Sequence, residues 1–324
     1  MEVILMKSRR GIIIHPEELE WSWVERMQDA HLNVLGLHPA GGANAHLTLE
    51  AAIHHRLLPE TQAMFDQLHH MGVEIEYEAH TMAWLLPRSL FSVKPQWFRM
   101  DESGNRVPDH NLCPSQPEAL DFVARRAEQL SRMLHVDSER HFFWLDDVSG
   151  SACHCEKCRA LSPSDQQMLV VNAMLRGLRR YRAGAKLSYL AYHDAIAAPQ
   201  KVEPLDGVFL EYAPFHRNAH RPIFDPDCAE NAREAQHIKP LLDFFGTKDS
   251  QVLEYWMDNS MYSNWTKPPK QFALDEAVMQ ADVNDYRALG FDSITSFGCF
   301  LGQDYRELWG EPPIRRYGEI LRGQ

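Results

Sequence analysis

Long apolar runs and clusters of basic side chains are both missing from this 324-residue sequence. No apolar run approaches the roughly 20 residues that a membrane-spanning helix needs, so we expect no association with a membrane. Lysine and arginine total 33 against 45 aspartates and glutamates, a net charge of −12, and they form no basic stripe, which argues against nucleic-acid binding. The first ten residues are too charged to hold the apolar core of a secretory signal, which predicts a soluble, cytoplasmic protein.

A dinucleotide-binding fingerprint and a disulfide framework are also missing. No Gly-x-Gly-x-x-Gly follows the first expected strand, so we expect neither an open doubly wound sheet nor an organic cofactor. Cysteines are few, six in all, and three of them fall within residues 153–158. Because a chain of this length does not depend on disulfides, such clustering favours a metal site or reduced thiols.

The sequence does contain a regular alternation of short β-type runs and amphipathic helical stretches. The eight expected strands cover residues 11–15, 33–38, 73–80, 141–148, 187–192, 208–212, 251–256 and 293–297. Helical sequence follows most of them, although residues 195–206 are too few for a full helix. Strands alternating with helices imply right-handed crossovers and a parallel sheet, and eight such units favour a closed barrel. We therefore predict an α/β fold, a single (β/α)₈ TIM-barrel domain over residues 1–324 with elaborated strand-to-helix loops, the longest at 81–113.

Acidic side chains gather at the expected ends of the strands, where the active sites of parallel barrels lie. Cleavage of a glycosidic bond needs two carboxyl groups, one to protonate the leaving oxygen and one to attack or to activate water. The catalytic candidates are Asp146, Asp147, Glu211 and Glu254. We expect Asp146 or Asp147 to be the acid, and only one of them to face the mouth of the barrel, because neighbours on a strand point to opposite sides. Glu254 is the first candidate for the nucleophile or base, and Glu211 is the second. The alternative for each is a helix cap or an ion pair.

Other polar and aromatic residues of the same strand ends and loops are candidates for substrate binding. They are His38, Glu78, His80, Tyr192, Arg217, Tyr255, Trp256 and Asp258. The planar fork of Arg217 suits bidentate contacts with a carboxylate or with hydroxyls. The loop tryptophans Trp84, Trp256, Trp265 and Trp309 offer flat apolar faces to the C–H bonds of a sugar, and ordinary packing is the alternative.

The most specific local motif is Cys153-His-Cys155-Glu-Lys-Cys158, in the loop after the fourth expected strand. Thiolates at this density suit a structural zinc ion. Cys113 is the first candidate for a fourth ligand, with His154 or Cys228 as alternatives. Such an ion would staple the loop and hold Asp147 in place. The alternative is a group of reduced thiols without metal.

The segments Trp144-Leu-Asp-Asp147, Cys153–Cys158, Ser162-Pro-Ser-Asp165 and Phe209-Leu-Glu-Tyr-Ala-Pro-Phe215 resemble a bacterial family labelled only as a domain of unknown function. That family is grouped with alpha-glucuronidase-like glycoside hydrolases. The resemblance implies a TIM barrel in which Asp147, Glu211 and Glu254 take the places of the catalytic acids. The Asp pair at 146–147 departs from the Glu of alpha-glucuronidases and is similar to hexosaminidase-type barrels, so a uronic-acid and an N-acetylhexosamine glycoside both remain candidates.

The sequence therefore predicts a glycosidase whose partner is a carbohydrate substrate. One alternative is a non-catalytic carbohydrate-binding barrel in which the acids only accept hydrogen bonds from hydroxyls. Another is a metal-dependent hydrolase, which would need a metal in the mouth of the barrel with an open coordination position. No oligomeric state is predicted.

Overall fold

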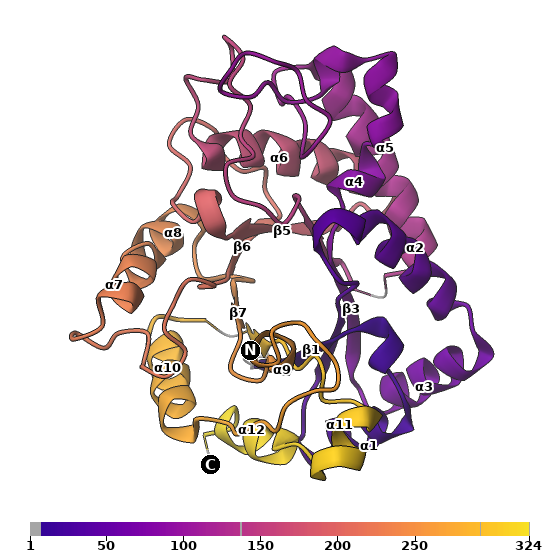
Figure 1. Ribbon diagram of the computed structural model, residues 1–324, viewed down its shortest axis with the longest axis vertical. Helices are drawn as coiled ribbons and strands as arrows, with labels where there is room; N and C mark the ends of the chain where they lie inside the picture. Colours follow the sequence, from indigo (N-terminus) through magenta and orange to yellow (C-terminus); the bar gives the residue numbers. More distant parts are fainter. Residues whose placement is uncertain (1–7, 137, 292, 324) are drawn as a thin grey trace, which may run out of the picture.

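A computed structural model describes residues 8–136, 138–291 and 293–323, which form a closed ring of eight parallel strands (Figure 1). The strands are β1 (Arg9–Ile14), β2 (Val34–Leu37), β3 (Glu74–His80), β4 (Arg140–Trp144), β5 (Lys186–Ala191), β6 (Val208–Tyr212), β7 (Gln251–Glu254) and β8 (Ser293–Ser296). Each strand pairs with the next and β8 pairs with β1, so the prediction of a TIM barrel is confirmed. Residues 1–7, which hold most of the segment tested for a secretory signal, lie outside the described residues.

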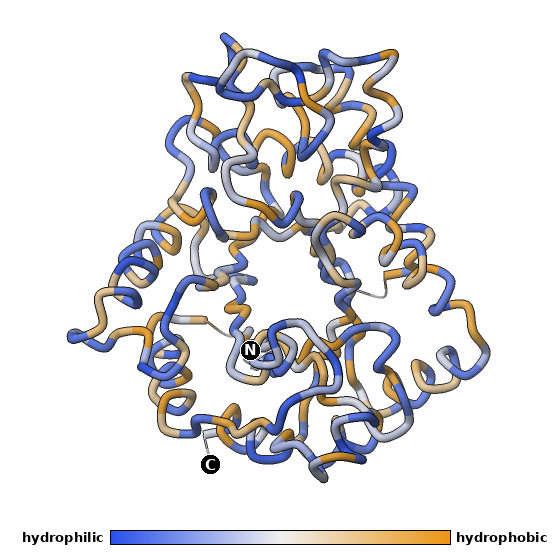
Figure 2. The backbone as a smooth tube through the Cα atoms, in the orientation of Figure 1, coloured by the Kyte–Doolittle hydropathy of each residue, from blue (hydrophilic) through white to orange (hydrophobic). Residues whose placement is uncertain are grey.

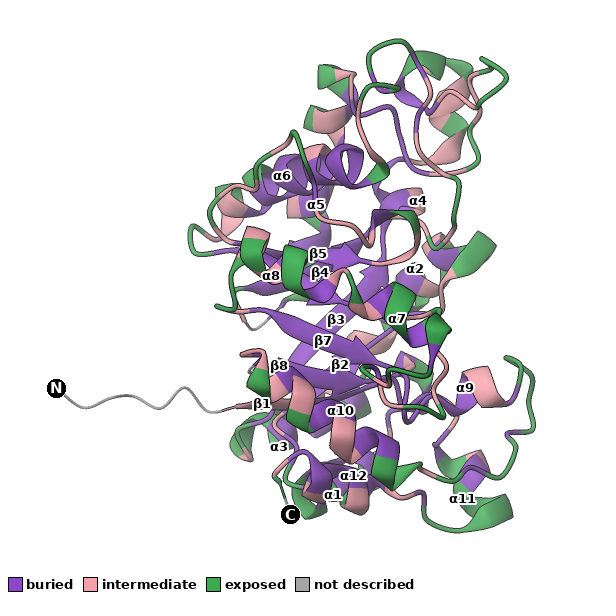
Figure 3. Cartoon of the chain, turned by 90° about the vertical axis from the view of Figure 1, so that its left-hand side faces the viewer, coloured by how far each residue is buried: buried purple, intermediate pink, exposed green. Residues whose placement is uncertain are grey.

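The helices lie outside the ring and expose one side to solvent, whereas the strands are buried (Figure 3). They are α1 (Trp21–Asp29), α2 (Ala45–Arg56), α3 (Pro59–His70), α4 (Met82–Leu85), α5 (Pro117–Leu134), α6 (Pro163–Tyr181), α7 (Ala229–Ala235), α8 (Ile238–Phe245), α9 (Asn259–Tyr262), α10 (Glu276–Ala288), α11 (Gln303–Trp309) and α12 (Ile314–Ile320). Hydrophobic and hydrophilic residues alternate along them, as expected for helices that bury one face (Figure 2). None of the described helices is long and apolar enough to cross a membrane.

Local sequence explains where several helices begin. Ser162 caps α6 by accepting a hydrogen bond from the backbone N–H of Asp165, and Pro163 occupies the first helical position. The helix α10 begins at Glu276, because the side chain of Asp275 caps it there. Two short helices, α7 and α8, lie between β6 and β7.

Apolar side chains pack in two layers, one inside the ring and one between the ring and the helices. The inner layer includes Ile13, Phe142 and Phe209, on alternating positions that point inward. Toward the N-terminal ends of the strands the interior becomes charged, where Arg9 pairs with Glu76. The open end of the barrel is therefore the C-terminal end, above the inner apolar layer.

Candidate functional site

A cavity of about 570 Å³ opens at the C-terminal ends of the strands. Of the residues proposed from sequence, it is lined by His38, His80, Asp147, Tyr192, Tyr255 and Asp258. It is also lined by His15, Gly41, His193 and Ser260, which were not among the proposed site residues. His15 could have been found from sequence, because it ends the first strand as His38 follows the second and His80 ends the third.

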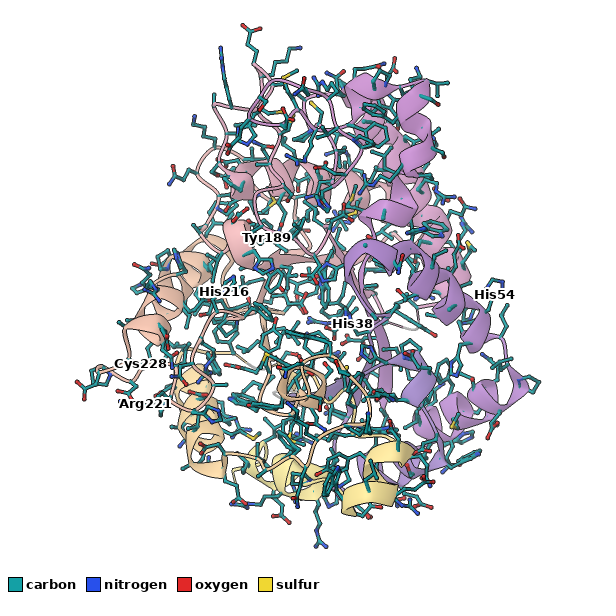
Figure 4. All side chains as sticks on the ribbon, in the orientation of Figure 1. His38, His54, Tyr189, His216, Arg221 and Cys228 are labelled. Carbon is teal, nitrogen blue, oxygen red and sulfur yellow. The ribbon has the colours of Figure 1, made fainter. Side chains whose placement is uncertain are left out.

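Three imidazoles stand side by side on the wall formed by β1, β2 and β3. Each uses Nδ1 to contact a backbone carbonyl of the neighbouring strand or the segment that follows it. His15 contacts the carbonyl of His38 at 2.8 Å, His38 that of Glu78 at 2.7 Å and His80 that of Leu145 at 2.6 Å. A carbonyl only accepts hydrogen bonds, so each Nδ1 carries a proton, and in the neutral form of such a ring the lone pair lies on Nε2. Figure 4 shows His38 inside the ring.

Asp147, directly after β4, is held as an ionised carboxylate. It accepts a hydrogen bond of 3.0 Å from the hydroxyl of Tyr192, and the Nε2 atoms of His193 and His80 lie 3.6 Å and 3.9 Å from its Oδ1. Burial works to raise the pKa of Asp147, but hydrogen bonding with His193 and Tyr192 and the charge of His80 outweigh it. The pKa of Asp147 is thereby held well below its usual range.

Two backbone features shape the surroundings of Asp147. A Cβ added to Gly41 would lie 3.1 Å from Oδ2 of Asp147 and 3.0 Å from His80, so the loop after β2 approaches the carboxylate as only glycine allows. His193 has a φ of 48°, in the left-handed region that non-glycine residues rarely occupy. Its Nδ1 lies 2.9 Å from Nε2 of His216, so the strained position links Asp147 to a second imidazole.

Asp258, after β7, is the second carboxylate of the cavity. Its Oδ1 caps α9 by accepting hydrogen bonds from the N–H and the hydroxyl of Ser260, at 3.0 Å and 2.5 Å, and from the N–H of Met261 at 3.3 Å. Burial nevertheless raises the pKa of Asp258 above its usual value, against these hydrogen bonds. Burial also raises the pKa of Tyr255, and the neighbouring Tyr192, Asp258 and Asp147 raise it further, so this ring stands near both carboxylates.

Asp146 lies outside the cavity and ties loops together. Its Oδ2 accepts hydrogen bonds from Arg88 and, at 2.6 Å, from the backbone N–H of Asn111, and the side chain of Asn111 accepts one from the N–H of Asp146 at 2.9 Å. Both partners belong to the long connection between β3 and α5. Of the two neighbouring aspartates, Asp147 is therefore the one that lines the cavity.

Glu211 and Glu78 lie inside the barrel, below the cavity. Glu211 accepts a hydrogen bond of 2.7 Å from the indole N–H of Trp144, which itself lines the cavity. Burial raises the pKa of Glu211 to about 7, and burial together with the charge of Glu211 raises that of Glu78 well above its usual value. Glu211 thus supports the cavity through Trp144, and neither carboxyl lines it.

Glu254, Arg217 and Trp256 lie behind β7, against α10. Glu254 accepts hydrogen bonds of 2.5 Å from both Arg217 and the hydroxyl of Tyr286, and Trp256 donates to Asp282 at 2.9 Å. The flanking residues of β7, Leu253 and Tyr255, are the ones that line the cavity. The alternation of the strand therefore turns Glu254 toward the helices.

Among the loop tryptophans, Trp265 is the one that lines the cavity. It is 63% exposed and projects from the segment after α9. Trp84 is buried and stacks beneath the guanidinium of Arg126. Trp309 is half-exposed and donates a hydrogen bond to the carbonyl of Pro269.

The four cysteines proposed as metal ligands gather in the loops beyond β3 and β4. The sulfur atoms of Cys113, Cys153, Cys155 and Cys158 all lie within 4.8 Å of one another and are buried. Gln166 of α6 fixes the loop by contacting the backbone of Cys153 on both its N–H, at 2.8 Å, and its carbonyl, at 3.1 Å. The prediction that Cys113 joins the other three is confirmed, and within the described residues no other group of potential ligands gathers so closely.

Comparison with known proteins agrees with this architecture. A family model described as "Domain of unknown function (DUF4838)" matches residues 43–243, more than half of the chain. A comparison with curated protein sequences found no match.

Several solved structures share the fold at low sequence identity. A beta-galactosidase from the psychrophilic Marinomonas ef1 matches with a TM-score of 0.55 at 13% identity, over 97% of this chain and 59% of that one. A tri-modular GH5 (subfamily 4) endo-beta-1,4-glucanase from Bacillus licheniformis matches with a TM-score of 0.57 at 11% identity, over 99% and 60%. A GH5-4 broad specificity endoglucanase from Clostridium acetobutylicum matches with a TM-score of 0.54 at 10% identity, over 98% and 97%. This chain thus spans about three fifths of the first two proteins, and the likeness shows a glycoside-hydrolase-like fold.

Proposed function

The chain belongs to the DUF4838 family, and we propose that it hydrolyses a glycosidic bond in the cavity at the C-terminal ends of its strands. The observation that carries the proposal is the pair of carboxyl groups lining this cavity, Asp147 after β4 and Asp258 after β7. Their surroundings move their pKa values in opposite directions. Such divergence is how an acid and a base are set apart within one site.

The directions of the two shifts assign the roles. Asp147 has a lowered pKa and stays ionised, so it serves as the nucleophile, or as the base that removes a proton from the attacking water. Asp258 has a raised pKa and is the better proton donor to the oxygen of the leaving group. These roles differ from the expectation that Asp146 or Asp147 is the acid and that Glu254 is the nucleophile or base, because Glu254 is turned away from the cavity.

Aromatic and imidazole groups complete the proposed binding site. The exposed ring of Trp265 offers a stacking face at the cavity rim, and Tyr255 lines the same cavity as the two carboxylates. The Nε2 atoms of His15 and His38 accept hydrogen bonds from sugar hydroxyls. His80 and Tyr192 contact Asp147 and orient it.

We further propose that the four cysteines hold a structural zinc ion. In a tetrahedral site with zinc–sulfur bonds of about 2.3 Å, neighbouring sulfur atoms lie about 3.8 Å apart. The sulfur of Cys113 lies 3.6 Å from that of Cys155 and 3.9 Å from that of Cys158. Four thiolates leave no open coordination position, so such an ion would tie the long connection after β3 to the loop after β4 and would take no part in catalysis.

A carbohydrate-binding protein without catalysis is the second candidate. It is favoured by the use of Oδ1 of Asp258 as a helix cap, which gives this carboxylate a structural role that needs no chemistry. The metal-dependent alternative is less well supported, because the group of potential ligands among the described residues lies in the cysteine loops and not in the mouth.

The test is a screen of the purified protein against nitrophenyl glycosides beside Asp147→Asn and Asp258→Asn. We expect turnover by the parent protein and a loss of at least about 100-fold in Asp147→Asn, the low end of a general base contribution; the loss in Asp258→Asn should be smaller on these substrates, because nitrophenolate leaves with little help from an acid. Binding of sugars without turnover by the parent, on long glycans as well as on nitrophenyl substrates, would establish the binding-only function instead. Asp243→Asn is the matched control, since Asp243 is exposed on α8 and does not line the cavity, and it should retain turnover.

A further inference from the structure

The polar lining of the cavity consists largely of hydrogen-bond acceptors. The Nδ1–H groups of His15 and His38 donate hydrogen bonds to backbone carbonyls, and their Nε2 atoms have no hydrogen-bond partner among the described residues. Burial, helped by the charges of His80 and His15, lowers the pKa of His38 to about 3, so this ring is neutral at physiological pH. Asp147 and Asp258 add two carboxyl groups to the same lining.

Two hydroxyl groups of the lining already donate to those carboxyl groups. The hydroxyl of Tyr192 donates to Asp147 at 3.0 Å, and that of Ser260 donates to Asp258 at 2.5 Å. A ligand that accepts hydrogen bonds from these two hydroxyls would have to break the bonds, whereas a ligand that donates hydrogen bonds can use the imidazole Nε2 atoms and the carboxylate oxygens.

Permanent positive charge does not reach the cavity. Among the described residues, no lysine or arginine lines it. The arginines and lysine on nearby segments are each paired with a carboxylate: Arg88 with Asp146, Arg217 with Glu254 and Asp282, and Lys267 with Asp304. Recognition of a sugar carboxylate ordinarily uses such cations, above all the fork of arginine.

From this arrangement we infer that the sugar bound beside Asp147 and Asp258 is an uncharged pyranose, a neutral hexose or an N-acetylhexosamine, and not a uronic acid. The inference rests on the proposed function and narrows it. A neutral sugar brings hydroxyl donors to the imidazole Nε2 atoms and the carboxylates. A uronic acid would bring another negative charge beside an ionised Asp147, with no lysine or arginine in the described lining to compensate it, and like charges brought together across an interface are costly.

The experiment titrates the intact protein with matched sugar pairs and follows tryptophan fluorescence, because Trp144 and Trp265 line the cavity. The pairs are glucose with glucuronic acid and galactose with galacturonic acid, with N-acetylglucosamine as a further neutral probe. We expect at least one neutral sugar to bind at least about tenfold more tightly than its uronic-acid partner. Asp147→Asn should narrow that difference, since it removes the repelling charge.

A second variant tests the acceptors directly. His38→Phe keeps an aromatic ring but removes Nε2, and it should weaken binding of the neutral sugar about three- to tenfold, the worth of one hydrogen bond. His54→Phe is the control, because His54 is exposed on the outer side of α2 and should leave binding unchanged (Figure 4). If His38→Phe fails to fold, the matched pairs on the unmodified protein still decide.

The outcomes distinguish the preference for a neutral sugar from the proposed hydrolysis of a carbohydrate. A uronic acid that binds as tightly as its neutral partner, or more tightly, overturns this inference and leaves carbohydrate hydrolysis standing. If neither monosaccharides nor longer glycans of either class bind, the proposed function itself fails, and the inference fails with it.

Discussion

Exchanging Glu254 for glutamine and Asp258 for asparagine should have opposite effects on stability and turnover. Glu254 is the last residue of β7, and Asp258 follows it four positions later. Sequence alone favours Glu254 as the nucleophile or base. The structure buries Glu254 between β7 and α10 and places Asp258 on the cavity. The two substitutions are matched, since each replaces a carboxylate by its amide.

The expected cost of Glu254→Gln follows from its contacts. Glu254 accepts two hydrogen bonds of 2.5 Å, from the guanidinium of Arg217 and from the hydroxyl of Tyr286. Both bonds end on Oε1, so the amide oxygen of glutamine can accept them, but a hydrogen bond to a charged group contributes about 1.5–3 kcal/mol and one between neutral groups about 0.5–1.5 kcal/mol. Arg217 also keeps Asp282, at 2.8 Å, as a counter-charge. We therefore expect the free energy of unfolding to fall by about 2–3 kcal/mol while turnover per folded molecule is retained.

The expected cost of Asp258→Asn falls on catalysis. Asparagine caps helices about as well as aspartate, so the free energy of unfolding should change by less than about 1 kcal/mol. Loss of a general acid should reduce kcat by about 10²- to 10⁴-fold, and most strongly on substrates whose leaving groups need a proton.

The assay combines urea denaturation followed by tryptophan fluorescence with turnover measured on the folded fraction of each variant. The reasoning is refuted if Glu254→Gln abolishes turnover at unchanged stability while Asp258→Asn remains active. That result would mean that the side chain of Glu254 reaches the substrate.

Three further outcomes are expected. Burial lowers the pKa of His38 from 6.5 to about 3, so between about pH 6.5 and pH 4 the unfolded chain takes up a proton on this side chain and the folded chain does not. The free energy of unfolding should therefore fall by up to about 3 kcal/mol as the pH drops through this window. His38→Gln should remove that part of the pH dependence of denaturation. Cys158→Ser should reduce the zinc bound per chain, measured by elemental mass spectrometry, and should make residues 81–113 and 148–162 more sensitive to protease, whereas equal zinc in both proteins would contradict the site. Trp265→Ala should raise KM about three- to tenfold without a change in the unfolding midpoint, because the ring is exposed; an unchanged KM would exclude Trp265 from substrate contact.

Much of the fold could be predicted because it depends on local patterns. Each strand and its helix is written in consecutive residues, and signals such as Ser162-Pro163 mark helix starts directly. The ends of helices with weaker signals, such as α10, are harder to predict, because a capping side chain, Asp275, decides the start rather than the apolar periodicity.

The direction of strand side chains was harder to predict. Both faces of a barrel strand are buried, so β7 shows no polar-apolar alternation that would tell Leu253 and Tyr255, which face the cavity, from Glu254, which faces α10. A carboxylate in such a strand looks equally catalytic on either face. Only the contacts of Glu254 with Arg217 and Tyr286, which lie far along the sequence, separate the two cases.

The cysteine cluster represents the opposite case. Three of its members are adjacent in sequence, and the chemistry of thiolates allowed a fourth to be sought at a distance. Cys113 lies near the end of the long connection between β3 and α5, and its sulfur lies within 4.8 Å of the other three.

The same connection also holds Arg88 and Asn111, which contact Asp146, the direct neighbour of Asp147. If the four sulfurs bind zinc, a chain that folds without zinc would keep the barrel but lose the contacts of Arg88 and Asn111 that position Asp146. Preparations from zinc-poor and zinc-rich cultures would then contain equal amounts of folded barrel and different amounts of competent enzyme. Specific activity should scale with the zinc content of a sample rather than with its protein concentration.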